Sequence, residues 1–193
     1  NRRGIIADLL GVEWELGRRG SSSFSFTIPY DSNARALLET YDLVKIKRGN
    51  GDLLDGRCEK PEYKMAEDGL AAATITVSGR DLTSILDERV VEPDAGENTM
   101  SYTGRPDDAM KHFVRYNQVA GYVVDTDREF SGLTCQPDRA EAPLPADPDE
   151  QEFQGDRTNY VLDICKDIGE TYGVDFAVRA DGAGGFDFDT YYP

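Results

Sequence analysis

Apolar residues alternate with small or polar residues along most of the first half of the chain. The alternation is clearest in Val12–Leu16, Ser23–Pro29, Leu43–Lys47 and Ala71–Val77. Because successive side chains of a strand point to opposite faces, each stretch predicts a strand with one buried face. Residues 53–58 predict a further strand, in which Gly56 marks a bulge or a close approach of another group. Strands at such intervals predict a small antiparallel β-barrel or sandwich.

Turn signals separate these strands. Gly17–Gly20 predicts the turn of a hairpin, and Arg48–Asp52 is the strongest turn signal in the chain. Asp31–Ala34 is expected to cap a short helix that runs through residues 37 and 38. Residues 59–69 are polar and predict an excursion between strands.

Residues 74–91 predict a corner in the chain. The alternation ends at Val77, and Ser78 and Gly79 interrupt it. Ser78 or Asp81 is expected to cap the helix that follows. Its apolar residues recur at spacings of three and four, which is typical of a helix, and they are Leu82, Ile85 and Leu86. We therefore expect the strand to give way to a helix at Gly79.

The second half predicts two helices and a hairpin. Apolar residues at helical spacing follow Pro106, and they recur over residues 160–172, where Gly173 is the expected C-cap. Val174–Val178 and Phe186–Tyr191 predict a terminal hairpin. An acidic, proline-containing segment at about 125–155 predicts a loop. The sequence as a whole predicts an α+β fold, mostly β, with an N-terminal β-barrel at 1–91 and a small α/β domain at 92–193.

The charge of the chain limits its partners. Of 193 residues, 21 are basic and 37 are acidic, which gives a formal net charge of −16. Such a charge argues against specific nucleic-acid binding and against an anionic membrane surface, because both need basic patches. No apolar run approaches the roughly 20 residues that span a bilayer. We also expect no secretory leader, although the start at Asn1 leaves a processed start open.

The cysteines and the single histidine argue against disulfides and zinc. Cys58, Cys135 and Cys165 are widely separated and contain no C-x-x-C pair, so they predict reduced thiols. A structural zinc site needs close pairs of Cys or His, and His112 is the only histidine. We therefore predict no metal ligand and no cofactor.

Candidate catalytic residues are interpreted as structural. His112 falls within the first predicted helix of the second half, and the serines at 21–23 lack the G-x-S-x-G elbow of nucleophilic serines. Two pairs of carboxylates are Asp125 with Asp127 and Asp187 with Asp189. Such pairs suit glycoside hydrolysis, but residues two apart also share one face of a strand, where carboxylates are simply hydrated. Pro148 disrupts the calcium-loop pattern of a further acidic group, Asp147, Asp149, Glu150 and Glu152. We predict no catalytic residue and no enzyme activity.

Two further features concern contacts with partners. Arg18 and Arg19 at the predicted hairpin tip favour a solvated turn, and contact with a neighbouring acidic subunit is the alternative. Trp14, Tyr191 and Tyr192 are candidate stacking platforms if the chain is a carbohydrate-binding or cell-wall-hydrolytic β-module acting on the bacterial envelope.

Several segments together resemble the opening of baseplate hub proteins of tailed bacteriophages, a family related to the hubs of contractile injection systems. The order is an F-x-F-x-I strand that ends in a proline, a Leu-Leu helix, and Tyr41–Ile46 followed by a G-x-L-x-x-G return. The strand–G-R-D–helix corner at Ile75–Leu82 is the most specific part. Asn159–Asp163, Gly173 and the hairpin after it also match in order and spacing, whereas the acidic segment 138–151 has no counterpart.

The resemblance implies a structural protein of the phage tail. Such hubs have two β-barrels separated by a small α/β domain, and they form homotrimers whose six barrels make a pseudo-hexameric ring between tail tube and tail tip. The implied partners are the tail-tube or distal tail, tape-measure and tail-tip proteins, and the implied location is the virion, after synthesis in the host cytoplasm. The unfinished edge of the terminal hairpin suggests that a second barrel follows, and this sequence largely lacks it. Whether this chain alone closes a ring is therefore left open.

The resemblance also gives the negative charge a possible use. DNA leaving the capsid would pass through the lumen of the ring, where an acidic wall repels phosphates instead of binding them. The alternative is that the acidic residues only keep a soluble surface hydrated.

Overall fold

The computed structural model describes residues 4–39, 42–48, 51–65, 73–123, 125–138 and 151–192. The chain forms two compact units. Unit 1 comprises residues 1–17 and 21–82, and unit 2 comprises residues 18–20 and 83–193. The fold is α+β and mostly β, as the sequence predicts. The domain boundary at residue 91 stays a prediction.

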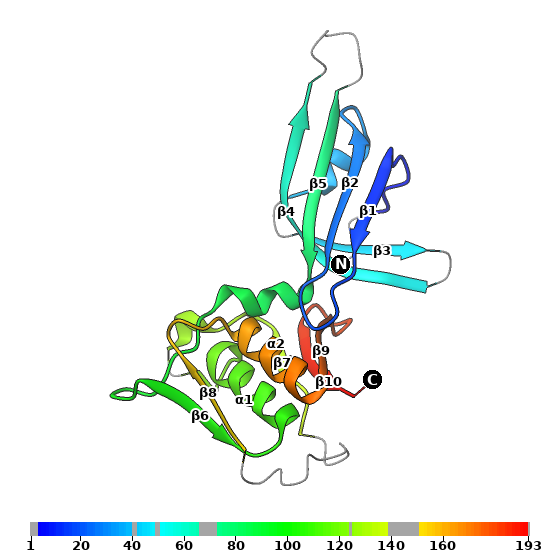
Figure 1. The fold of residues 1–193 in the computed structure, drawn as a ribbon. Helices are drawn as coiled ribbons and strands as arrows, with labels where there is room; N and C mark the ends of the chain where they lie inside the picture. Colours follow the sequence, from blue (N-terminus) through cyan, green and yellow to red (C-terminus); the bar gives the residue numbers. More distant parts are fainter. Residues whose placement is uncertain are drawn as a thin grey trace. The chain divides into compact units, whose positions relative to one another are not determined.

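Unit 1 contains a curled five-stranded antiparallel sheet that forms a half-barrel (Figure 1). The strands lie in the order β1-β2-β5-β4-β3, with the bounds β1 Gly11–Glu15, β2 Ser23–Pro29, β3 Leu43–Arg48, β4 Gly51–Lys64 and β5 Thr74–Asp81. A short 3₁₀ helix, η1, spans Asn33–Leu37. The Ser32 side chain caps it by accepting a hydrogen bond from the Ala34 N–H at 3.0 Å.

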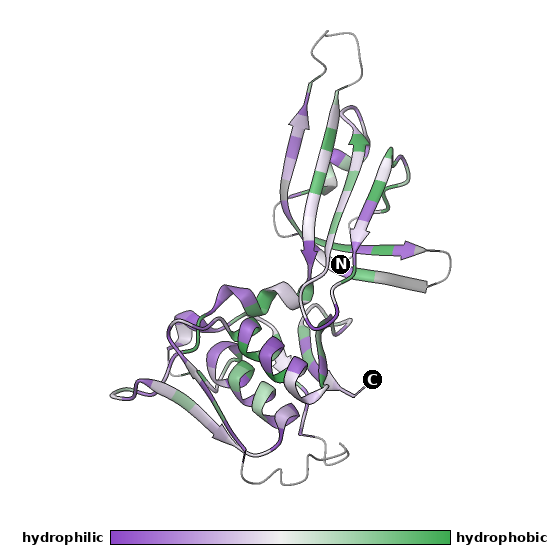
Figure 2. Ribbon diagram, viewed as in Figure 1, coloured by the Kyte–Doolittle hydropathy of each residue, from purple (hydrophilic) through white to green (hydrophobic). Residues whose placement is uncertain are grey.

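The core of unit 1 lies on one face of the sheet, where the alternating pattern places the apolar residues. Phe24, Phe26 and Ile28 of β2 are buried, as are Ile75 and Val77 of β5. β2 and β5 are antiparallel neighbours in which Phe26 lies opposite Val77, so these side chains share one face. The alternation of hydropathy along both strands is visible in Figure 2.

Two predictions for unit 1 are wrong. The polar residues 59–64 do not leave the sheet, because β4 continues through them and pairs with β5 after a register shift between Cys58 and Lys60. Gly79 does not end its strand, since it pairs with Phe24 on one side and Cys58 on the other. Gly79 instead allows the Phe24 ring to pack closely against the strand. Residues 49 and 50 of the predicted turn at 48–52 lie outside the described residues.

Unit 2 contains two packed helices between two small sheets (Figure 1). The helices are α1 Pro106–Gln118 and α2 Val161–Tyr172, with short 3₁₀ helices η2 Leu82–Glu88 and η3 Thr126–Arg128. One sheet has the order β7-β10-β9, and the other pairs β6 with β8. Their bounds are β6 Thr99–Thr103, β7 Leu133–Cys135, β8 Glu152–Asp156, β9 Asp175–Ala180 and β10 Phe186–Tyr191.

The predicted helix ends in unit 2 are confirmed. Pro106 occupies the first turn of α1, where its missing N–H removes no helical hydrogen bond. Gly173 ends α2 with φ 75°, a left-handed conformation that favours glycine. Met110 and Phe113 of α1 are buried, as are Leu162 and Cys165 of α2. Among the described residues, no helix is long and apolar enough to span a membrane.

The segment of unit 2 at about 125–155, which was expected to be a loop, contains strands. β7 and most of β8 lie within it, and β6 is a strand that no predicted element covers. β7 pairs in parallel with β10, so the terminal hairpin has a third strand on one side. Residues 139–150 lie outside the described residues, and with them Asp147, Asp149 and Glu150.

Candidate interaction surface

Large apolar side chains are exposed along and beside the outer strand β1 of unit 1. Trp14 of β1 retains 39% of its accessible surface, and Leu10 and Leu16, which flank the strand, retain 61% and 59%. Trp14 lies opposite Phe24 in the pairing of β1 with β2, and Val12 lies opposite Phe26. Paired residues of adjacent strands share a face, so Trp14 continues the core face of the sheet to its open rim. This rim is the feature of unit 1 best suited to bind another protein surface.

The other face of the two outer strands is charged. Glu13 and Glu15 alternate with the apolar residues of β1 and are exposed. Lys45 and Lys47 occupy the equivalent positions of β3 and are also exposed, while Val44 and Ile46 pack against the core. The ammonium of Lys45 lies 3.2 Å from the carboxylate of Asp55 on β4. Both outer strands therefore have one apolar and one charged face.

A second surface feature, in unit 2, is a stack of aromatic rings along α1. The His112 ring lies 4.9 Å from that of Tyr102 and 4.5 Å from that of Tyr116, and Tyr116 contacts Tyr122 at 6.1 Å. Burial, followed by the charge of Arg115, lowers the pKa of His112. The spacing of His112 and Tyr116 on one helix is the signal that could have predicted part of this stack.

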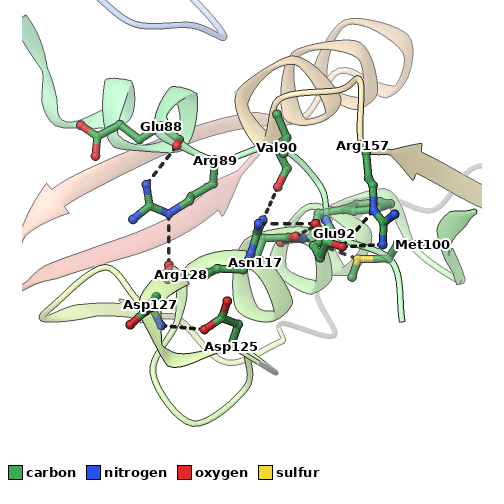
Figure 3. A network of polar contacts seen from close by, with 11 residues as sticks. Glu88, Arg89, Val90, Glu92, Met100, Asn117, Asp125, Asp127, Arg128 and Arg157 are labelled. Atoms are coloured by element: carbon green, nitrogen blue, oxygen red, sulfur yellow. Dashed lines mark hydrogen bonds and ion pairs between the residues drawn. The ribbon is translucent and has the colours of Figure 1, made fainter. Parts of the chain in front are cut away.

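A network of polar contacts connects segments of unit 2 (Figure 3). The fully buried Asn117 side chain accepts a hydrogen bond from the Glu92 N–H at 2.7 Å and donates one to the Phe113 carbonyl at 2.7 Å. Glu92 in turn accepts a hydrogen bond from Arg157 at 2.9 Å. Arg128 donates to the Val90 carbonyl. These side chains are occupied by structural contacts within unit 2, and Figure 3 shows them converging on the loop before β6.

The two arginines at 18 and 19 do not form a simply solvated turn. Arg19 donates a hydrogen bond to the Asp175 carboxylate at 2.7 Å, and both side chains are largely buried. Arg18 lies 3.4 Å from the same carboxylate but stays 64% exposed. All three residues belong to unit 2. The expectation of a solvated turn is therefore wrong for Arg19, whose charge is neutralised within its own chain.

The carboxylate pairs that suited glycoside hydrolysis accept structural hydrogen bonds. Asp125 caps η3 by accepting from the Asp127 N–H at 3.0 Å. Asp187 accepts from Thr134 at 3.0 Å and from Gln136, and it thereby links β10 to the segment around β7. Asp189 accepts from the Thr190 N–H at 2.9 Å. Glu152, the one member of the acidic group considered for calcium that lies within the described residues, is exposed at the start of β8.

The remaining candidates also have structural positions. Ser22 is buried and its hydroxyl accepts from the Gly17 N–H at 3.1 Å. Among the described residues, no group of three His, Cys, Asp or Glu side chains is placed to bind a metal. All three cysteines are free thiols, and burial raises the pKa of Cys58 to about 11 and that of Cys135 to about 12.

The candidate stacking platforms belong to different units. Trp14 lies in unit 1, and Tyr191 and Tyr192 lie in unit 2. Tyr191 is covered by the guanidinium of Arg179 at 5.4 Å. Burial, followed by the charge of Asp107, raises the pKa of Tyr192.

Comparisons with solved structures identify the class of this fold. The Escherichia coli c3393 protein, a type VI secretion system component with structural similarity to the T4 bacteriophage tail proteins gp27 and gp5, matches with a TM-score of 0.55 at 11% identity. That match covers 98% of this chain and 47% of the other. A 43 kDa tail protein of prophage MuSo2 from Shewanella oneidensis matches with a TM-score of 0.48 at 14% identity, over 88% of this chain and 44% of the other. The chain thus spans less than half the length of these structures, and its fold is similar to that of the c3393 protein.

The family follows from the sequence itself. A family model described as "Siphovirus ReqiPepy6 Gp37-like protein" matches residues 1–192. The chain belongs to this family. No curated protein matches the sequence.

Proposed function

We propose that the chain is part of a tail hub, a homotrimeric ring that joins the tail tube to the tail tip. The single observation that carries the proposal is the family match over residues 1–192, on a fold shared with a tail-type protein. The exposed apolar rim at Leu10, Trp14 and Leu16 supports a role in protein–protein contact, because a strand edge of this kind needs a partner. In this role the chain works through surfaces and performs no chemistry.

The partners that fit this role are copies of the chain and the neighbouring proteins of the tail. They are the distal tail or tube protein, the tape-measure protein and the tail-tip proteins. The ring is assembled from chains made in the host cytoplasm. Its negative charge suits the passage of DNA through a lumen that does not bind phosphates, in accord with the net charge of −16.

Labelling of intact particles tests this function. Gold-conjugated antibodies against the chain, applied to virions of the phage that encodes it, are expected to label the end of the tail in electron micrographs. Antibodies against the capsid protein serve as the positional control. Label on the capsid, or purified virions that lack the chain, would contradict the proposal.

A further inference from the structure

The aromatic rings that gather at the surface of unit 2 are those of the α1 stack, which consists of Tyr102, His112, Tyr116 and Tyr122. The His112 ring contacts those of Tyr102 and Tyr116 with interplanar angles of 36° and 38°. Tyr122 contacts Tyr116 at an angle of 67°. Rings from β6, from α1 and from the turn after α1 therefore form one unbroken series of contacts.

The outer end of the α1 stack is exposed. Tyr116 and Tyr122 retain 43% and 52% of their accessible surface, whereas Phe113, beside His112 in the sequence, is fully buried in the core. A tyrosine combines an apolar ring with a hydroxyl that both donates and accepts hydrogen bonds. The outer end therefore offers apolar surface and hydrogen-bonding groups at the same place.

The inner end of the stack holds these rings in position. A Cβ on Gly104 would lie 3.0 Å from Cε1 of Tyr102, so this ring packs on the backbone just after β6. His112 and Tyr116 are one helical turn apart in α1, and the contact between their rings restricts both side chains. A side chain that is already ordered in the free protein loses little conformational entropy on binding. The stack is therefore preorganised for a ligand that packs on aromatic rings.

The charges around the stack favour an uncharged ligand. Burial, followed by the charges of Asp108 and Asp138, raises the pKa of Tyr102, so both carboxylates lie near its phenol. The Asp138 carboxylate lies 2.9 Å from Nη2 of Arg115 and stays 50% exposed, so it can accept a further hydrogen bond. An anionic ligand would meet these carboxylates as well as the net charge of −16.

We propose that the α1 stack binds a neutral glycan, with sugar rings against Tyr116 and Tyr122 and sugar hydroxyls bonded to the two phenols and to Asp138. The C–H groups of a sugar ring form an apolar face that packs on an aromatic ring, and its hydroxyls need hydrogen-bonding partners at the rim of that ring. The inference goes beyond the proposed tail function and does not depend on it. The site also differs from the platforms suggested by the sequence, since Trp14 and Tyr191 lie in different units, whereas the whole α1 stack belongs to unit 2.

Titration of the full chain with neutral oligosaccharides tests the proposal. The probes are chitohexaose, cellohexaose and maltohexaose, and isothermal titration calorimetry measures their binding. At least one of them is expected to bind, and the anionic hexagalacturonate is expected to bind more weakly. Failure of all the neutral probes, or tighter binding of hexagalacturonate, would overturn the proposal.

Substitutions in the stack locate the binding surface. Tyr116→Ala and Tyr122→Ala are each expected to weaken binding of the sugar about fivefold to tenfold, because an aromatic contact is lost. Tyr122→Phe keeps the ring and removes the hydroxyl, so a smaller loss is expected. Tyr160→Ala is the matched control, as Tyr160 is 44% exposed in the same unit but lies outside the stack. Circular dichroism verifies that each variant folds, and equal affinities of Tyr116→Ala, Tyr122→Ala and Tyr160→Ala would overturn the proposal.

Sedimentation velocity without sugar distinguishes a glycan from a second copy of the chain as the occupant. The unmodified chain and Tyr122→Ala are expected to sediment alike. Self-association of the unmodified chain that is lost in Tyr122→Ala would make the stack a protein contact and overturn the glycan site. Tail-end labelling of virions is independent of these results, so the proposed function and this inference fail separately.

Discussion

At the residue scale, two glycines of the unit 1 sheet leave room for the ring of Phe24. A Cβ built on Gly79 would lie 2.5 Å from Cζ of Phe24 and 2.2 Å from the Arg57 carbonyl oxygen. A Cβ on Gly56 would lie 2.6 Å from Cε1 of the same ring. The ring of Phe24 therefore packs directly on the backbone of β4 and β5, which is the reason for glycine at both positions.

Gly79→Ala is expected to destabilise unit 1 by about 1–3 kcal/mol, because neither the ring nor the backbone carbonyl can move away freely. Trp14 is the only tryptophan, so its fluorescence during urea unfolding reports on unit 1. Gly11→Ala is the control, since a Cβ there meets nothing within 4 Å. Equal unfolding midpoints for the two variants would contradict this account of Phe24.

His112 gives the stability of unit 2 a dependence on pH. Its folded-state pKa is lowered from 6.5, mainly by burial among aromatic rings, so the unfolded chain binds the proton more tightly. The stabilisation is complete above the ordinary pKa and is lost as the pH falls below it. His112→Phe keeps the stack and is expected to flatten this dependence between about pH 7 and pH 5.

Urea unfolding followed by circular dichroism at several pH values measures the effect of His112. One titrating group can contribute at most about 1.4 kcal/mol per pH unit. Tyr172→Phe is the comparison variant, because Tyr172 lies outside the stack and the variant keeps His112. An unchanged pH profile in His112→Phe would show that other groups determine it.

At the scale of elements, the loop before β6 is fixed to α1 by Asn117. The side chain is fully buried, and it satisfies the Glu92 N–H and the Phe113 carbonyl while its amide also lies 3.6 Å from the sulfur of Met100. Asn117→Ala leaves the Glu92 N–H without its acceptor and opens a small cavity. Loss of such a buried contact costs about 1–3 kcal/mol.

Unfolding followed at the helical signal in circular dichroism measures this cost, because both α-helices belong to unit 2. Asn98→Ala is the control, as Asn98 is exposed in the loop before β6. We expect a clear loss of stability for Asn117→Ala and almost none for Asn98→Ala. Similar values would mean that α1 holds this loop by other contacts.

The elements that the sequence predicted well are those whose order comes from local patterns. The strand at Ser23–Pro29 was predicted with its observed ends because Phe24, Phe26 and Ile28 alternate with polar residues. α2 and its Gly173 cap followed from helical spacing and one glycine. In these cases a single buried face leaves a clear period in the sequence.

The elements that were missed depend on distant partners. β7 has three residues and is a strand because it pairs with β10, which lies about fifty positions later. Residues 59–64 are polar, yet they pair with β5 across a register shift that no local pattern encodes. The same limit applies to surfaces: Trp14 could be selected from the sequence, but the exposed rim and the partnership of Arg19 with Asp175 required the fold.

At the scale of the whole molecule, net charge predicts how the chain behaves toward DNA. With a formal charge of −16, the chain repels a duplex that carries one negative charge per about 1.7 Å. A lumen that lets DNA pass needs this absence of affinity. Two of the positive side chains have acidic partners, because Arg19 contacts Asp175 and Lys45 lies beside Asp55.

The sign of the salt dependence makes this prediction sharp. A DNA-binding protein binds more tightly as salt is removed, because it releases counterions from the phosphates. For this chain we expect no binding to a labelled duplex in fluorescence anisotropy, either at about 150 mM salt or at about 10 mM salt. At the lower salt concentration the Debye length grows to about 30 Å, so the repulsion between the chain and the duplex reaches further. A basic DNA-binding domain in the same titration provides the positive control. Binding that appears only at low salt would reveal a local basic surface strong enough to outweigh the net charge, and the acidic chain would then hold DNA instead of letting it pass.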